Sequence, residues 1–386
     1  MRNGMKIYDA DTHVRPSAEA IRPHLSKKVL DGIPDLEERK EPIKVGLAGE
    51  IREAPFRHTY KFASHKGWSS AKPRILGEAA PRENAERKFQ NFMGVTFPTD
   101  RTDDDNAEGR LRDMDREGSD VHFIVSNGGP GHPDPEMEME FIAAQHRYLD
   151  AFCGTNPRRL KSSLSVSPLS IEKSVEEINK WGDKPWAVAV HPSLPLDYPL
   201  DHPDLHPIWA AAQKKGLCII HHSFATGYPG YRDLWENPFI GRCASHPWAA
   251  MRAVASFVGG GLMDRFPDLK YGVLESGFGW VPFWARRMDD QAIYVGYTAE
   301  LKHKVSDYLS SGRFFTSIEQ HEGSDMARIF NETMGDHVLM FGSDYPHAES
   351  RFPESADRVL AWQNVLGAES MKKMMWDNPV SFFGEP

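Results

Sequence analysis

The first side chains that could do chemistry lie near the start of the chain, in the sequence YDADTHVR at residues 8–15. The apolar run at residues 5–10 predicts a buried strand, and Asp11 and His13 follow it. Residues two positions apart in an extended segment point the same way, so both side chains can aim at one point. A carboxylate oxygen and an imidazole nitrogen that meet there suit Zn, Mn or Fe. The alternative is a capping aspartate beside a surface histidine.

Residues of metal-binding types also follow several later apolar runs. These are His191 after 186–190, His221 and His222 after 217–220, Glu275 after 269–274, Glu319 and His321 after 314–318, and Asp344 and His347 after 338–341. Only one of His221 and His222 can face inward, because neighbours on a strand point to opposite faces. A buried carboxylate such as Glu275 is unfavourable unless it is paired or metal-bound. Taken singly, His191 could be a packed histidine and Asp344 a helix cap. The metal hypothesis therefore depends on the occurrence of such residues after several strands together.

Alternating strands and helices must position these side chains. Besides the opening strand, strands are expected at residues 121–125, 163–166, 186–190, 217–220, 269–274, 314–318 and 338–341, with helices at 107–117, 135–152, 171–181, 204–215, 247–266, 281–297, 324–334 and 355–366. Such alternation is typical of parallel βαβ units, and eight strands predict one closed (β/α)8 (TIM) barrel domain over residues 1–386. An open doubly wound sheet is the second choice, because no glycine-rich phosphate fingerprint follows the first strand. In a barrel, the candidate ligands share the rim formed by the C-terminal strand ends.

The segment at residues 35–106 interrupts this alternation after the first strand. It is rich in charge, carries scattered proline and glycine, and is too long for a plain loop in a compact domain. We therefore predict an insertion that acts as a lid, a hairpin arm or a subunit interface. Disorder is the alternative, but disordered segments are poor in aromatic residues. This segment holds Phe56, Tyr60, Phe62, Trp68, Phe89 and Phe92.

Composition narrows the function classes further. The chain has 386 residues, a formal net charge of −9 and a pI of about 6.0. No basic run stands out, so neither nucleic acid nor an anionic membrane surface is expected as a partner. The three scattered cysteines, Cys153, Cys218 and Cys243, indicate a reduced protein and not a disulfide framework. No run approaches about 18 apolar residues and the first residues lack an apolar signal region, so a soluble cytoplasmic protein is expected.

Longer motifs surround the candidate residues. They are DTH at 11–13, DMDREG at 113–118, the run at 216–222, GGGLMDRFPDL at 259–269, LESGFGW at 274–280 and FGSDYPH at 341–347. Together they resemble the amidohydrolase superfamily, in particular its amidohydrolase-related branch of small aromatic-acid decarboxylases and hydrolases. The resemblance runs from end to end apart from the insertion, and its last two motifs are the most specific. It implies a metal-dependent barrel with ligands from strands one, five, six and eight, and sometimes four.

Carried over residue by residue, the resemblance implies that Asp11, His13 and Asp344 are ligands, and that His222 rather than His221 is the strand-five ligand. This chain departs from the family pattern at three positions. The superfamily often has His-x-His on strand one and His on strand six, where this chain has Asp11 and Glu275. Its two-metal members often carry a bridging carboxylated Lys or Glu on strand four, where this chain has His191. The expected ligands to one or two Zn, Mn or Fe ions are Asp11, His13, His191, His222, Glu275 and Asp344.

Three functions fit this set. In the first, the metal activates water or polarises a small anionic substrate, which is hydrolysed at a C–N or C–C bond or decarboxylated. Asp344 is then a ligand or general base, while His347, His191 or Arg15 orients the substrate, Arg15 through a bidentate contact. In the second, Mn or Fe ions activate oxygen, as in the dinuclear hydroxylases that some members resemble. In the third, the chain is a non-catalytic metal-binding subunit of a hetero-oligomer. A homo-oligomer or a hetero-oligomer with a related chain is expected.

Overall fold

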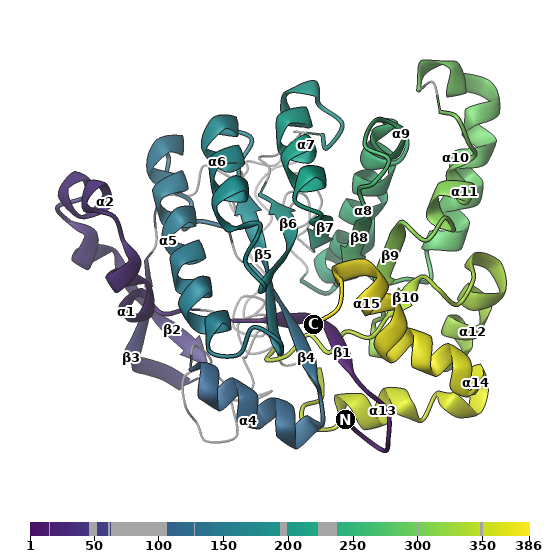
Figure 1. Cartoon of the computed structure of the whole chain (residues 1–386), viewed down its shortest axis with the longest axis horizontal. Coiled ribbons are helices and arrows are strands. Elements are labelled where there is room, and N and C mark those ends of the chain that lie inside the picture. The colour runs from purple at the N-terminus through teal and green to yellow at the C-terminus, as the bar shows by residue number, and fades with distance from the viewer. Residues whose placement is uncertain are drawn as a thin grey trace, which may run out of the picture.

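The computed structural model describes residues 1–14, 16–45, 52–60, 62, 106–126, 128–193, 199–222, 238–299, 301–347 and 350–386. Eight parallel strands follow one another in chain order (Figure 1). They are β1 (Tyr8–His13), β4 (Val121–Val125), β5 (Leu160–Val166), β6 (Ala187–Pro192), β7 (Cys218–His222), β8 (Tyr271–Leu274), β9 (Phe314–Ser317) and β10 (Leu339–Met340).

Helices lie on the outside of the strands (Figure 1). They are α1 (Ala18–Ile21), α2 (Lys27–Gly32), α4 (Ala107–Glu117), α5 (Pro135–Gly154), α6 (Ile171–Trp181), α7 (His206–Lys214), α8 (Pro238–Phe257), α9 (Leu262–Arg265), α10 (Val281–Val295), α11 (Val305–Leu309), α12 (Gly323–Met334), α13 (Ser355–Leu360), α14 (Gln363–Lys372) and α15 (Asn378–Phe383). Local sequence sets their ends: α4 begins where the Asn106 side chain accepts a hydrogen bond from the Gly109 N–H, and it stops at Gly118, whose φ is 87°. In the part of the chain described, no helix is long and apolar enough to cross a membrane.

The seam between β1 and β10 closes the barrel. Across it, the Asp344 N–H donates to the Asp11 carbonyl at 2.9 Å, and the His13 N–H donates to the Tyr345 carbonyl at 2.6 Å. Thr12 and Tyr345 also form a parallel bridge. The first strand therefore pairs with the last, as a (β/α)8 barrel requires. The predicted barrel is confirmed, and the open doubly wound sheet is wrong.

The barrel interior is a packed core. Apolar side chains of the strands fill it, namely Tyr8, Ala10, Val121, Phe123, Val125, Ala189, Cys218, Ile220, Leu274, Phe315 and Met340. Helix α15 adds Phe382 and Phe383 near the N-terminal strand ends, where Phe383 stacks on Phe123 with ring centroids 4.2 Å apart. Gly272 makes room for this helix, because a Cβ there would lie 2.4 Å from the Phe382 ring. The last helix thus plugs the end of the barrel opposite the C-terminal rim.

Three elements differ most from the sequence prediction, and one of them, the closing helix expected at residues 355–366, is divided into α13 and α14. The opening strand is expected at residues 5–10, but β1 spans Tyr8–His13, so Asp11 and His13 lie within it. The helix expected at residues 247–266 is shifted and divided, because α8 starts at residue 238 and ends at Phe257 before the short α9. The glycines at 259–261 explain the division: Gly261 has a φ of 77°, which lies outside the helical region.

The described part of the insertion is a hairpin. Strands β2 (Lys40–Val45) and β3 (Arg52–Tyr60) pair antiparallel, and the side chains of Tyr60 and Phe62 pack against Phe141 of α5. These two aromatic residues are buried, so this part is ordered against the barrel helices. Residues 46–51, 61 and 63–105 lie outside the described residues. The single-domain division of 1–386 and the role of 35–106 as a lid or interface remain predictions.

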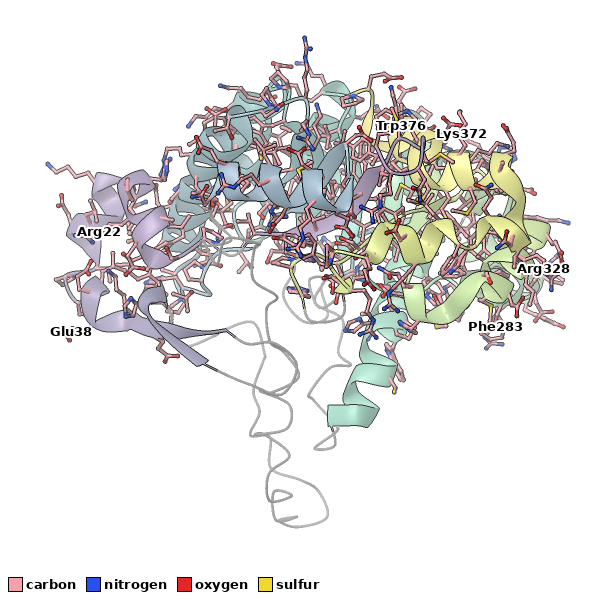
Figure 2. All side chains as sticks on the ribbon, turned by 90° about the horizontal axis from the view of Figure 1, so that it is seen from below. Arg22, Glu38, Phe283, Arg328, Lys372 and Trp376 are labelled. Atoms are coloured by element: carbon pink, nitrogen blue, oxygen red, sulfur yellow. The ribbon has the colours of Figure 1, made fainter. Side chains whose placement is uncertain are left out.

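Replacing Phe382 with alanine should destabilise the protein, because this side chain is 3% exposed and fills the end of the barrel. Loss of a buried phenylalanine costs about 3–5 kcal/mol, measured as the free energy of unfolding in urea. Phe283→Ala is the control, since Phe283 of α10 is 60% exposed and lies at the edge of the molecule (Figure 2). Its substitution should change stability by about 0.5 kcal/mol or less. Equal changes in the free energy of unfolding for the two variants would contradict the conclusion that Phe382 closes the end of the barrel.

Candidate metal centre

Four strand ends bring ligand side chains together at the C-terminal rim. Asp11 and His13 belong to β1, His222 ends β7, Glu275 directly follows β8, and Asp344 follows β10. All five side chains are buried. The fold thus assembles residues that lie far apart in the chain, as the sequence predicts for a barrel rim.

Each of two histidines lies between two carboxylates. His13 Nε2 is 2.9 Å from Asp344 Oδ1 and 3.4 Å from Asp11 Oδ1. His222 Nε2 is 3.0 Å from Glu275 Oε2 and 3.4 Å from the same Asp11 oxygen. Asp11 therefore links the two halves of the site.

His347 extends this group toward the solvent. Its Nδ1 lies 2.8 Å from Asp344 Oδ1, and its ring stacks on that of His13 with centroids 4.4 Å apart. The possible ligand atoms fall into two overlapping sets, each with its members within 4.8 Å of one another. The sets are His13, Glu275, Asp344 and His347, and Asp11, His13 and His222. Because the two sets share His13, the arrangement suits either one ion or two adjacent ions.

A β-bulge turns the two β1 ligands toward this centre. The register against β4 shifts between Asp9 and Thr12, where β1 has one residue more than its neighbour. Asp9 then braces the seam, because its Oδ1 accepts hydrogen bonds from the N–H groups of Asp11 (3.3 Å) and Ser343 (2.9 Å). One buried carboxylate thus holds both ligand-bearing segments.

Two ligands occupy strained backbone conformations. Glu275 has a φ of 48° and Asp344 a φ of 61°. The left-handed region costs a residue with a side chain roughly 1–3 kcal/mol, and it persists only where the surroundings enforce it. Here the left-handed backbone directs both carboxylates toward the histidines. Backbone strain is often retained at functional sites for such a purpose.

The spacing of the donor atoms suits coordination of a metal ion better than it suits hydrogen bonds among the side chains. His13 Nε2, His222 Nε2 and Asp11 Oδ1 are buried and lie within 3.4 Å of neighbouring donors or acceptors. Yet among the described residues none of the three makes a hydrogen bond of acceptable geometry. Metal–ligand bonds of about 2.0–2.2 Å place neighbouring ligand atoms about 3–3.5 Å apart, which matches the separations here. Mixed carboxylate and imidazole donors suit Zn, Mn or Fe.

The charges in the pocket are strongly coupled. Burial opposes a proton on His222, but Asp11 and Glu275 outweigh it and raise the pKa of His222 well above its ordinary value. Burial, assisted by His347, lowers the pKa of His13. Burial would raise the pKa of Asp344, but His347 and His13 bring it far below its usual range. The pocket therefore draws positive charge to His222 and keeps the Asp344 carboxylate ionised.

The two other carboxyls behave differently. Burial raises the pKa of Asp11, although His222 opposes this shift. Burial and Asp344 would raise the pKa of Glu275, but His222 outweighs them and the pKa of Glu275 is lowered. Glu275 therefore enters the site as a carboxylate.

Other candidates lie near this centre or beyond it. His191, at the end of β6, has Nδ1 2.8 Å from the Ser126 carbonyl and its ring 6.0 Å from that of His222. Neither His191 nor His221 belongs to the two ligand sets found among the described residues. Arg15 lies outside the described residues.

Two further ionisable residues lie beside the centre. His246 of α8 has Nδ1 3.8 Å from Glu275 Oε1, and the sequence offered no signal for it because it lies within a helix. Glu319, which follows β9, is noted in the sequence as a rim carboxylate without a role. Burial, with Glu275 and Asp344 nearby, raises the pKa of Glu319 well above its ordinary value. Glu319 can therefore present a neutral carboxylic acid to the pocket.

Comparison with known proteins agrees with this geometry. The sequence matches the family model described as Amidohydrolase over residues 9–384. The chain belongs to the amidohydrolase family. The predicted family is thus confirmed, and membership makes the chain a metal-dependent hydrolase or decarboxylase. A search of curated proteins finds no significant match.

Several solved amidohydrolase-fold structures resemble this chain. The 5-carboxyvanillate decarboxylase of Novosphingobium aromaticivorans, complexed with manganese and 4-hydroxy-3-methoxy-5-nitrobenzoic acid, is 18% identical with a TM-score of 0.67, covering 99% of this chain and 97% of that one. The 5-carboxyvanillate decarboxylase of Sphingomonas paucimobilis is 16% identical with a TM-score of 0.61, covering 99% and 100%. The 2,6-dihydroxybenzoate decarboxylase from Rhizobium is 17% identical with a TM-score of 0.61, covering 71% and 87%. At these identities the likeness establishes the shared fold.

Divalent metal should stabilise the amidohydrolase through this centre. Mn²⁺ at about 100 times its dissociation constant should add about 2.7 kcal/mol to the free energy of unfolding, seen as a rise in Tm. Asp344→Asn should lose most of this rise, because the neutral amide is a weaker ligand. Asp336→Asn is the control, since Asp336 pairs with Lys373 away from the centre. An undiminished Mn²⁺-dependent rise in Asp344→Asn would show that the ion binds elsewhere.

Proposed function

We propose that this chain is a divalent-metal-dependent decarboxylase of a small aromatic carboxylic acid. The observation that carries the proposal is the pair of overlapping ligand sets that share the buried His13. From their members we assign Asp11, His13, His222 and Asp344 as the ligands of one ion. The decarboxylases that share the fold are named for 5-carboxyvanillate and 2,6-dihydroxybenzoate, and manganese is bound in one of them. Manganese and a hydroxylated benzoate are accordingly the proposed metal and substrate class.

The four residues just named would hold the ion. A bound divalent metal would neutralise the carboxylate and phenolate oxygens of such a substrate and stabilise the charge that develops as CO2 leaves. Burial of the surrounding side chains keeps water away, which strengthens these electrostatic interactions.

The protein must also supply a proton. When CO2 leaves an aromatic ring, the electron pair of the broken C–C bond stays on the ring carbon, which then takes up a proton. His347 suits this role, because its side chain is 40% exposed and its Nδ1 is hydrogen-bonded to Asp344. It can therefore exchange protons with solvent while staying fixed beside the centre. We propose that Arg15 and His191 orient the substrate carboxylate, Arg15 through a bidentate contact.

Hydrolysis of a C–N or C–C bond would use the same centre with water as the nucleophile. The residues that hold the ion would be unchanged, and Asp344 would take the proton of that water. The two reactions differ in their products, because only decarboxylation releases CO2.

A second candidate function is oxygen activation by two Mn or Fe ions. Glu275 and His347 favour it, because with His13 and Asp344 they form a second ligand set beside that of Asp11, His13 and His222. Carboxylate-rich mixed donor sets suit Mn and Fe as readily as Zn. The number of bound ions separates this candidate from decarboxylation.

The decarboxylase should release CO2 from ortho-hydroxylated benzoic acids when loaded with Mn²⁺. His347→Gln should lower kcat by about 10²–10⁴-fold and change KM little, because a proton donor acts in the chemical step. His321→Gln is the control, since the His321 side chain is 77% exposed and lies outside both ligand sets. Release of an amine from amide-bearing analogues of these acids, with no CO2 released from the acids themselves, would replace decarboxylation with hydrolysis of a C–N bond.

Elemental analysis should find about one metal equivalent in the wild-type protein and in Glu275→Gln if four residues hold a single ion. Two equivalents of Mn or Fe in the wild type, falling to one in Glu275→Gln, would instead support the dinuclear hydroxylase. Asp336→Asn again serves as the control for a carboxylate removed elsewhere.

A further inference from the structure

Helix α4 carries buried charges on the face that meets the barrel seam. Arg110, Asp113 and Glu117 are each 1% exposed and recur at helical spacing, where an amphipathic helix normally places apolar residues. The Arg110 Nε and Nη1 atoms find no hydrogen-bond partner among the described residues. Burying such groups is unfavourable, so their presence calls for an explanation beyond packing.

Two of these residues, Arg110 and Asp113, contact the Tyr345 side chain at different points. The Arg110 guanidinium lies over the Tyr345 ring, 4.5 Å from its centroid. The Tyr345 hydroxyl donates a hydrogen bond of 2.6 Å to Asp113 Oδ2. The cation over the ring face and the carboxylate at the hydroxyl together fix the orientation and the position of the Tyr345 ring.

The same cluster is directly connected to two proposed ligands. Arg110 Nη2 donates a short hydrogen bond to the His13 carbonyl. The His13 N–H in turn donates to the Tyr345 carbonyl at 2.6 Å. Tyr345 also follows Asp344, whose backbone is held at a φ of 61°. Movement of the Tyr345 ring would therefore displace His13 and Asp344 together.

We propose that Arg110, Tyr345 and Asp113 are positioning residues that set the affinity of the centre for its metal ion. They touch neither the ion nor the substrate, and they act by holding His13 and Asp344 at their 2.9 Å separation. The inference rests on the metal centre of the proposed function and is independent of the substrate. A merely structural role predicts lower stability with unchanged metal affinity, so metal affinity is the deciding measurement.

Tyr345→Phe tests the proposal by removing one hydroxyl. Outer hydrogen-bond partners of metal ligands contribute about 10–100-fold to metal affinity. The Tyr345 hydroxyl bonds to Asp113 and not to a ligand, so the Kd for Mn²⁺ should rise by the lower end of this range, about 10-fold. The Kd is measured by chelator competition on the metal-free protein, and urea unfolding of the same metal-free sample measures stability. Neither readout involves turnover, so a wrong substrate class leaves the result intact.

Tyr308→Phe is the matched control. The Tyr308 side chain is buried, and its hydroxyl donates to Asp264 Oδ2 in a pairing like that of Tyr345 with Asp113. It belongs to α11, which precedes β9 and so lies toward the N-terminal end of the barrel, away from the rim. Tyr308→Phe should lose stability while its Kd for Mn²⁺ stays within about twofold of the wild type.

Asp113→Asn and Arg110→Lys complete the test if Tyr345→Phe does not fold. Asparagine can still accept the phenol hydrogen bond but lacks the charge, and lysine keeps the charge but not the planar group over the ring. Both should weaken Mn²⁺ binding at least fivefold under conditions where circular dichroism shows a folded barrel. Wild-type affinity in every folded variant of the three positions would overturn the proposal.

Discussion

The crowding of buried carboxylates at the barrel rim is the constraint on which the rest of the structure depends. Asp11, Glu275 and Asp344 surround His13 and His222, and like charges this close repel strongly where water is scarce. Positive charge must be present among them, either on His222 or on a bound cation. The bulge in β1 and the left-handed backbone at two ligands are the means by which the chain holds this unfavourable group together.

Support for that group comes from the outside of the barrel. Asp9 braces the seam through backbone N–H groups, and Arg110 reaches the same seam from α4. Both are buried ionisable groups, and burial raises the pKa of Asp9 well above its ordinary value. Apolar side chains nevertheless form the larger buried cluster between the strands and helices. A smaller apolar cluster fills the inside of the barrel and its far end, where Phe382 and Phe383 close it. Asp9 and Arg110 are therefore local exceptions to an otherwise apolar layer.

Much of the fold could be predicted from the sequence. Short apolar runs indicate strands and amphipathic runs indicate helices, and strands that alternate with helices are compatible with only a few folds. Helices α4 and α6 and strand β4 match their expected ranges residue for residue. Asp11, His13, Glu275 and Asp344 could be placed at one rim for the same reason, and the family motif selected His222. The shift of β1 and its bulge could not be predicted from the sequence. The charged inner face of α4 could not be predicted either, because an analysis of hydrophobic periodicity assigns charged residues to the exposed face of a helix. His246 was missed because its helix approaches the rim only in three dimensions.

Closure of the barrel by its first and last strands also determines when the centre can form. A chain is synthesised from its N-terminus, so β1 emerges long before β10 and α15 exist. Contacts between such distant segments are slow to form, because the whole intervening chain must first be organised. A nascent or truncated chain without β10 would expose Asp11 and His13 but lack Asp344 and the pocket around it. The full set of candidate ligands therefore exists only in a chain that has been completed through β10.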